Sequence, residues 1–161
     1  MIYFECYSDE TFLSSLGVIA KDLDHSFSKG NVCNKLDRSL NCVGLVDEDP
    51  NEPQPRFIQE IFNQNRVTFK DKNLIFCFDK RTSNKLVLIR PNIEVWSVKI
   101  AQDLKIDLEK KPYQLSSNSN RLHEMLAFSR NIKKFAAFKQ FFVDSKNHHS
   151  IVQVKEFIFS K

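Results

Sequence analysis

Glycine is scarce in this chain of 161 residues, which contains only three glycines. Both the P-loop and the dinucleotide-binding fingerprint need several glycines within one short loop, because the backbone must approach the phosphate groups closely. Gly17, Gly30 and Gly44 are too far apart to form either motif. The sequence therefore excludes both kinds of phosphate-binding loop.

The four cysteines also lack the spacing of a metal site. They form no Cys-x-x-Cys pair, and Cys6, Cys42 and Cys77 fall in or beside apolar stretches. Zinc sites usually combine closely spaced cysteine or histidine pairs. We therefore expect these cysteines to be small buried apolar side chains.

Long apolar runs are missing as well. No run approaches the roughly 20 residues that cross a bilayer. Residues 1–15 contain Glu5, Asp9 and Glu10 and lack the basic start of a secretory signal. The sequence predicts no membrane segment and a cytoplasmic location.

Charge is distributed unevenly along the chain. Residues 1–65 contain five Lys or Arg and eleven Asp or Glu, whereas residues 66–161 contain nineteen and nine. An acidic part that can hold a cation and a basic part that can hold a polyanion suit a protein that acts on nucleic acid. The alternative is that the lysines and arginines only solvate exposed helix faces.

Apolar periodicity and turn residues predict alternating strands and helices. Strands are expected at 1–4, 42–46, 66–69, 74–78 and 85–89, and helices at 9–20, 31–40, 55–62, 92–104, 120–128, 132–143 and 150–159. This order predicts an α/β fold of the Rossmann-like type, with a mainly parallel sheet flanked by helices. The serine- and asparagine-rich loop at 116–120 divides an expected core, residues 1–115, from a helical C-terminal extension, residues 116–161, that packs on it.

Acidic residues follow the first two predicted strands. Glu5 follows strand 1–4, and Asp47 and Asp49 follow strand 42–46. Parallel strands end at the same edge of a sheet, which is where open α/β sheets bind ligands. Asp47 and Asp49 have the same parity, so on a continuing strand both would point to one face and need a cation between them. The pattern favours a Mg²⁺ or Mn²⁺ site, and the alternative is an acidic turn ended by Pro50.

Four further charged residues are candidates for this site. Glu94 begins a predicted helix, where it either favours the helix dipole or binds the metal. Asp9 is expected to cap the first helix rather than bind metal. Arg90 and Lys85 lie near opposite ends of one strand, so only one of them can offset negative charge in the site. Arg90 is favoured because it follows the carboxyl end.

Three segments resemble motifs of a known superfamily. The stretch 2–13 is similar to an apolar strand that ends in Glu, often Glu-Gly-x-x-Asp, before a helix. The stretch 43–49 resembles an apolar strand that ends in Asp-x-Asp, and the stretch 90–96 resembles a Pro-x-x-Glu-x-Trp segment of small proteins of the same kind. On these motifs, residues 1–95 resemble the topoisomerase–primase (Toprim) superfamily. Cys6 in place of the usual glycine and Pro50 after the aspartate pair depart from the pattern.

The resemblance implies a function and a set of roles. Glu5 would be a general acid or base, and Asp47 and Asp49 would bind magnesium. The implied activity is that of a nuclease or nucleotidyl-transfer enzyme acting on DNA or RNA. Some relatives of this kind act beside ATPases in bacterial anti-phage defence, so an ATPase is the implied protein partner.

Two other functions stay open. A Toprim-like module without catalytic activity would dock on a partner such as an ATPase and keep its acidic residues for structure or ion sensing. A small RNA-binding protein would instead use the basic C-terminal half, and its affinity would fall steeply with salt. Turnover separates the first function from both alternatives.

Overall fold

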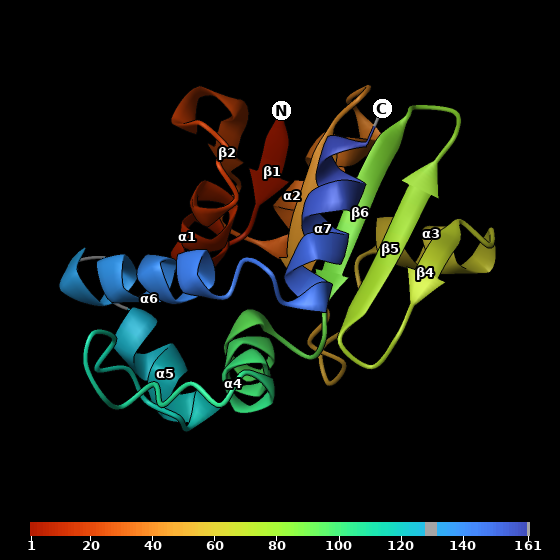
Figure 1. Ribbon diagram of the computed structural model, residues 1–161. Coiled ribbons are helices and arrows are strands. Elements are labelled where there is room, and N and C mark those ends of the chain that lie inside the picture. The colour runs from red at the N-terminus through yellow and green to blue at the C-terminus, as the bar shows by residue number, and fades with distance from the viewer. Residues whose placement is uncertain (128–131, 161) are drawn as a thin grey trace.

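The computed structural model describes residues 1–127 and 132–160 of the chain. Its centre is one six-stranded sheet, in the order β2-β1-β3-β6-β5-β4 (Figure 1). The strands are β1 (Ile2–Phe4), β2 (Leu23–His25), β3 (Val43–Asp47), β4 (Val67–Lys70), β5 (Leu74–Asp79) and β6 (Asn84–Ile89). The first four strands in that order are parallel, and β5 and β4 continue the sheet as antiparallel strands. The predicted α/β class with a mainly parallel, Rossmann-like sheet is confirmed.

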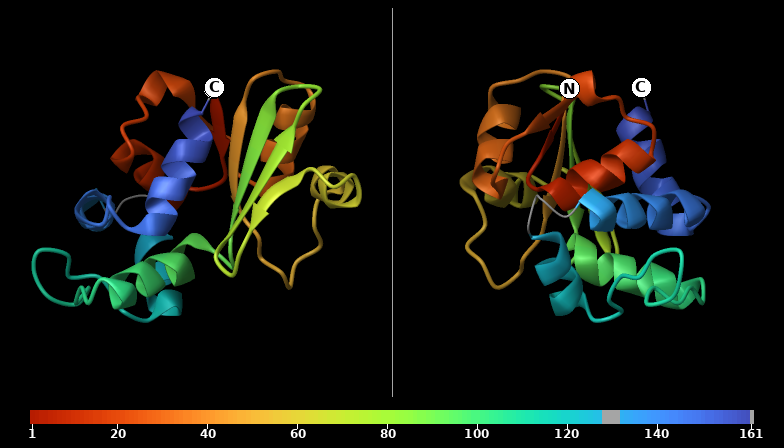
Figure 2. Two further views of the ribbon diagram at one scale, coloured as in Figure 1. Left: turned by 45° about the vertical axis from the view of Figure 1, so that its right-hand side comes forward. Right: turned by 90° about the vertical axis from the view of Figure 1, so that its left-hand side faces the viewer.

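Helices cover both faces of the sheet. They are α1 (Tyr7–Ser15), the 3₁₀ turn η1 (Ala20–Asp22), α2 (Lys29–Asp37), α3 (Arg56–Asn63), α4 (Ile93–Asp103), α5 (Ser119–Leu126), α6 (Ile132–Asp144) and α7 (His149–Phe159). The left view of Figure 2 shows α2 and α3 on one face and α1 and α7 on the other. None of the helices in the described segments has the length and apolar character needed to cross a membrane.

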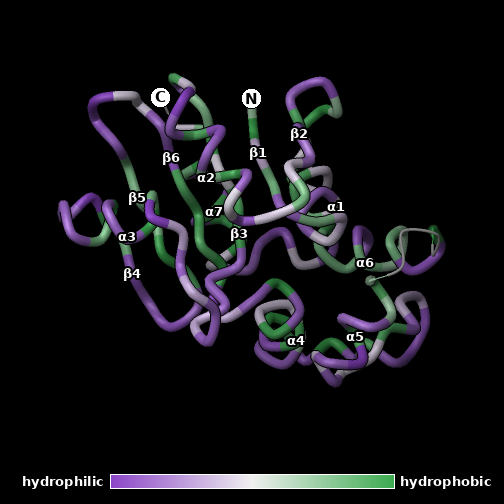
Figure 3. The backbone as a smooth tube through the Cα atoms, turned by 180° about the vertical axis from the view of Figure 1, so that it is seen from behind, coloured by the Kyte–Doolittle hydropathy of each residue, from purple (hydrophilic) through white to green (hydrophobic). Residues whose placement is uncertain are grey.

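The central strands are buried on both faces. On β3, Val43 and Leu45 pack into the apolar cluster of α1, α4 and the C-terminal helices, whereas Val46 packs against α2 and α3. A strand covered on both sides is a continuous apolar run rather than an alternating one. Figure 3 shows this as hydrophobic stretches in the central strands, with hydrophilic residues gathered in the loops.

The C-terminal helices contribute to the same core. Phe142 of α6 packs on Phe12 of α1, with ring centroids 4.8 Å apart. Phe157 of α7 stacks on Phe76 of β5 at 4.5 Å. The structure therefore places α6 against α1 and α7 against the sheet. The last residue of the helix predicted at 120–128, Phe128, lies outside the described residues.

The structure differs from the sequence prediction at several element boundaries, such as α1, which ends at Ser15 rather than near residue 20, and in the region of β2 and α2. β2 was not expected, because its three residues, Leu23, Asp24 and His25, show no apolar alternation. It forms the short edge of the sheet and pairs with β1 alone. Helix α2 begins at Lys29 rather than at residue 31, because Ser28 caps it by accepting a hydrogen bond from the Asn31 backbone.

Gly44 allows α2 to lie close against β3. A Cβ atom at position 44 would lie 2.6 Å from Leu36 Cδ1, 3.0 Å from Leu86 Cδ1 and 3.1 Å from Val32 Cγ1. We expect Gly44→Ala to lower the free energy of unfolding by about 1–3 kcal/mol, because overpacking displaces buried side chains. Gly30→Ala is the matched control, since its nearest atom would be 4.0 Å away. Equal urea midpoints for Gly44→Ala and wild type would contradict this packing.

Candidate functional site at the carboxyl edge of the sheet

Three helices begin at the carboxyl edge of the parallel strands. α1 follows β1, α2 follows β2, and α4 follows β6, all by short connections. In Figure 1 this edge faces downward, toward α4 and α5. Helix N-termini carry free N–H groups and the positive end of the helix dipole. The edge is therefore suited to negatively charged groups.

Five carboxylates gather at this edge, contributed by Glu5, Asp9, Asp47, Asp49 and Glu94. We refer to them as the carboxylate cluster. The pKa of Asp47 is well above its ordinary value, first because the group is buried and then because the other four carboxylates repel its negative charge. Asp47 is thus the centre of the carboxylate cluster.

Asp9 and Asp47 both accept hydrogen bonds from the beginning of a helix. Asp9 Oδ2 accepts from the Glu5 and Cys6 backbones at 3.2 and 3.1 Å, which fits the capping role expected for it. Asp47 Oδ1 accepts from the Ile93 backbone, the first residue of α4, at 2.9 Å. The other oxygen of Asp9, Oδ1, is buried without a hydrogen-bond partner. Burial and the neighbouring Glu5 raise the pKa of Asp9 to about 7.

Glu5 is partly buried, and one of its oxygens has no partner. Its Oε2 atom is buried without a hydrogen bond. Burial raises the pKa of Glu5 above its ordinary value, while the Lys29 ammonium group and the backbone N–H groups of Asp47 and Lys29 oppose that rise. A raised pKa is the direction expected of a carboxyl group that acts as a general acid or base.

Asp47 and Asp49 do not point to the same face, contrary to the parity argument. β3 ends at Asp47, and Asp49 takes a positive φ of 42° that turns the chain. Asp49 Oδ2 lies 3.3 Å from Lys29 Nζ at the start of α2, whereas Asp47 contacts the start of α4. These two helices belong to opposite faces of the sheet. The expectation failed because the strand does not continue through the Asp-x-Asp segment.

Glu94 links three helices at this edge. It is 4% exposed, and its Oε1 accepts a hydrogen bond from Ser8 Oγ of α1 at 3.3 Å. His123 Nδ1 of α5 lies 3.4 Å from the same oxygen. Its position at the start of α4 agrees with the expected interaction with the helix dipole.

The two predicted cations lie at opposite ends of β6. Arg90 is at the carboxyl edge, where its Nε donates to Glu48 Oε2 at 2.8 Å. Lys85 pairs with Val43 at the other end, and its Nζ donates to the Phe157 carbonyl at 2.8 Å. Lys85 therefore caps the end of α7, and the structure does not bring it to the carboxylate cluster.

Lys29 is a cation of the site that sequence analysis missed. It is 6% exposed, forms the ion pair with Asp49, and donates to the Glu48 carbonyl at 2.9 Å. Sequence analysis predicts a helix only from residue 31, so it does not bring Lys29 to the acidic residues. The signal that could have found it is the Ser28 cap, which makes Lys29 the first residue of a helix.

The donor set fits a hard divalent cation in chemistry but only partly in arrangement. Carboxylate oxygens are the ligands that Mg²⁺ and Mn²⁺ prefer, and Glu5 Oε2 and Asp9 Oδ1 are free of protein partners. Within residues 1–127 and 132–160, however, no three Asp, Glu, His or Cys side chains converge on a point that could hold an ion. Metal binding therefore requires at least one carboxylate to leave its present partner.

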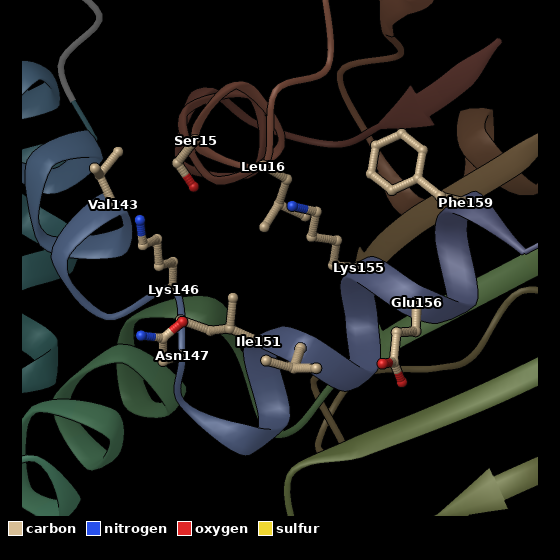
Figure 4. Close-up of a pocket in the computed structure, with 10 residues that line it drawn as sticks. Ser15, Leu16, Val143, Lys146, Asn147, Ile151, Lys155, Glu156 and Phe159 are labelled. Carbon is tan, nitrogen blue, oxygen red and sulfur yellow. The ribbon is translucent and has the colours of Figure 1, made fainter.

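Two cavities in the described part of the chain lie away from the carboxylate cluster. One of about 530 Å³ opens between the end of α1 and helix α7, and Figure 4 shows Leu16, Lys155 and Phe159 around it. Another, of about 610 Å³, is lined by residues that include Lys85 and Phe157. Neither is lined by a member of the carboxylate cluster, so neither extends this site.

A serine, a histidine and an aspartate also meet near the start of α7. His148 Nδ1 lies 2.8 Å from Ser150 Oγ, and His148 Nε2 lies 3.4 Å from Asp103 Oδ2. Ser150 has no exposed surface, so a substrate could not reach its hydroxyl group. Burial lowers the pKa of His148, with a smaller contribution from His149. This group therefore stabilises the start of α7 and is not a nucleophilic site.

Comparison of the chain with protein-family models, with curated proteins and with solved structures finds no match. Function is therefore inferred from the geometry of the carboxylate cluster.

Proposed function

We propose that this protein is a Mg²⁺- or Mn²⁺-dependent enzyme that cleaves or transfers phosphodiesters of nucleic acid at the carboxylate cluster. The observation that carries the proposal is the gathering of five carboxylates around Asp47, two of them with buried oxygens that lack a partner. Burying several like charges at one edge is unfavourable unless protons or a cation neutralise them. The order of the motifs supports the proposal, because Glu5, which follows β1, and Asp47, which ends β3, lie at one edge, as the Toprim resemblance implies.

The residues of the site have separate roles in this proposal. Asp47, Asp49 and Glu94 supply oxygen ligands, together with Glu5. A bound divalent cation supplies Lewis-acid stabilisation of a phosphate and a more acidic water molecule. Glu5 accepts or donates the proton, because its pKa is raised.

Positive groups at the edge offset the charge of the phosphate. Lys29 supplies a cation beside Asp49, whereas Lys85, the less favoured of the two cations expected from sequence, lies at the other end of β6. Arg90 is the second cation, although its guanidinium group now binds Glu48. The basic C-terminal half of the sequence supplies attraction for a polyanion.

A second candidate function is a Toprim-like module without catalytic activity that docks on a partner such as an ATPase, in anti-phage defence or elsewhere. One observation favours it: Asp47 is already bonded to the Ile93 backbone, and Asp49 is already paired with Lys29. Carboxylates with these partners can serve the fold alone. In that case the protein binds no metal, or binds metal without turnover.

Isothermal titration of Mg²⁺ and Mn²⁺ tests the proposal together with a nuclease assay on the same samples. We expect binding to the wild type and binding at least about tenfold weaker to the double variant Asp47→Asn/Asp49→Asn. Loss of a metal ligand, or of a group that orients one, typically lowers metal affinity by at least this factor. Asp37→Asn/Asp107→Asn is the matched control, since it removes the same charge from exposed positions. Binding without cutting would favour the docking module, and no binding would contradict the metal site.

A further inference from the structure

An aromatic stack stands beside the carboxylate cluster. The ring of His25 lies between Phe4, with centroids 5.1 Å apart, and Phe27, at 4.1 Å, and both pairs are stacked. Tyr7 meets His25 edge-on at 4.6 Å. His25 Nε2 lies 3.0 Å from the backbone carbonyl oxygen of Glu5, so the stack adjoins the chain segment that carries the proposed acid or base.

The stack runs from the core to the solvent. Phe4 is 2% exposed, whereas Phe27 is 75% exposed and Tyr7 is 43% exposed. One side of the Phe27 ring rests on His25, which leaves much of the phenyl group open to water. Phe27 and Tyr7 therefore form one exposed aromatic surface around the His25 ring.

The backbone of Phe27 is strained. Its φ is 65°, in the left-handed region, which is unfavourable for a bulky side chain. The other non-glycine residues with positive φ are of polar types, namely Asn41, Asp49, Asn65, Ser83, Lys105 and Gln114. Strain of this kind is characteristic of functional sites, where the surrounding structure holds a residue in place.

We propose that Phe27 stacks an unpaired base, so that the substrate of the site is single-stranded nucleic acid; this inference rests on the proposed function. Every base presents a flat π-face, and stacking on an exposed aromatic ring does not depend on sequence. The bases of a duplex already stack on one another and cannot use this ring. Phe27 precedes the start of α2 by two residues, so a nucleotide stacked on its ring would lie beside the start of that helix.

Fluorescence anisotropy of a fluorescein-labelled oligothymidylate of about 12 nucleotides, in EDTA, tests the inference without any turnover. We expect Phe27→Asn to weaken binding by roughly 5- to 100-fold, the range that loss of one stacked base predicts. Phe27→Trp should retain the affinity of the wild type. Phe159→Ala, which removes a ring that is 52% exposed at the end of α7, should not change it.

The stability of Phe27→Asn provides an independent readout. Asparagine tolerates the left-handed region, so this variant should melt at or above the temperature of the wild type even though it binds more weakly. If this variant is folded and binds the oligonucleotide more weakly, the loss of affinity is caused by removal of the aromatic ring and not by unfolding.

Three results would overturn the inference. The first is equal affinity of Phe27→Asn and the wild type for the oligonucleotide. The second is equal affinity of the wild type for single strands and duplex. The third is a dimer, seen by light scattering, that depends on Phe27 and forms without oligonucleotide binding. Failure of the proposed chemistry is recognised separately. A wild type that never cuts but binds single strands through Phe27 in EDTA keeps the stacking role and loses the catalytic one.

Discussion

Glu5→Gln will lower the rate of metal-dependent cleavage by at least about 100-fold, the usual contribution of a general acid or base. Glutamine keeps the size of the side chain but neither accepts nor donates a proton in this pH range. The carboxyl group of Glu5 is the one at this edge that combines a raised pKa with an unpartnered oxygen and a cationic neighbour, Lys29. A gel assay on a single-stranded oligonucleotide with Mg²⁺ or Mn²⁺ measures the effect.

The control for this variant is Glu10→Gln, which makes the same change in the first turn of α1. We expect it to keep the wild-type rate. Glu5→Gln should also melt at a higher temperature than the wild type, because it removes a partly buried charge from a cluster of like charges. Wild-type cleavage by a folded Glu5→Gln protein would refute the assignment of Glu5.

The meeting of Glu5 and Asp47 could be predicted from sequence because it follows from topology. Each residue ends or follows an apolar strand, and each strand leads into a helix. Such units pair in parallel with right-handed crossovers, so the two carboxyl ends share an edge. The register of β1 with β3 bears this out, since Phe4 lies opposite Leu45.

The direction of Asp49 and the position of Lys29 could not be predicted in the same way. Both depend on where a strand ends and a helix starts to within one or two residues, which is the least certain part of a pattern-based prediction. A positive φ at Asp49 turns its side chain toward α2, and a cap at Ser28 brings Lys29 to meet it. Neither the positive φ nor the helix cap changes the apolar periodicity from which strands and helices are predicted.

The stack of Phe4, His25 and Phe27 shows the same limit. It depends on β2, an edge strand of three half-buried residues whose pairing is visible only once β1 is in place. Phe27 in the sequence is one of fifteen phenylalanines, and most phenylalanines belong to a core. Its exposure and its strained backbone are properties of the tertiary structure alone.

The protein will be more stable at pH 5 than at pH 8 in the absence of divalent metal. The pKa of Asp9 is about 7 in the folded protein, against an ordinary value of 3.8, and that of Asp47 is also raised. A group with a raised pKa binds its proton more tightly when folded, so its contribution is complete below the ordinary value and is lost as the pH rises through the folded value. We expect a loss on the order of 2–4 kcal/mol. Thermal unfolding across this range measures it.

Asp9→Asn isolates this contribution. Asparagine keeps an oxygen that can accept from the Glu5 and Cys6 backbones but carries no titrating proton. The variant should therefore lose much of the decline between pH 5 and pH 8. His148, whose pKa is lowered by burial, acts in the opposite direction and is common to both proteins, so it cancels in the comparison. The same decline in Asp9→Asn and the wild type would show that the buried carboxyl group of Asp9 does not control it.

Magnesium should reverse the decline at high pH, because protons and a divalent cation compete for the same carboxylate oxygens. We expect added Mg²⁺ to raise the melting temperature of the wild type at pH 8 and to have little effect at pH 5. The Asp47→Asn/Asp49→Asn variant should show no such difference between the two pH values. Equal stabilisation of the wild type at both pH values would mean that the ion binds away from the protonated carboxylates. The carboxylate cluster would then have a structural role, in which the starts of α1, α2 and α4 stabilise its negative charges.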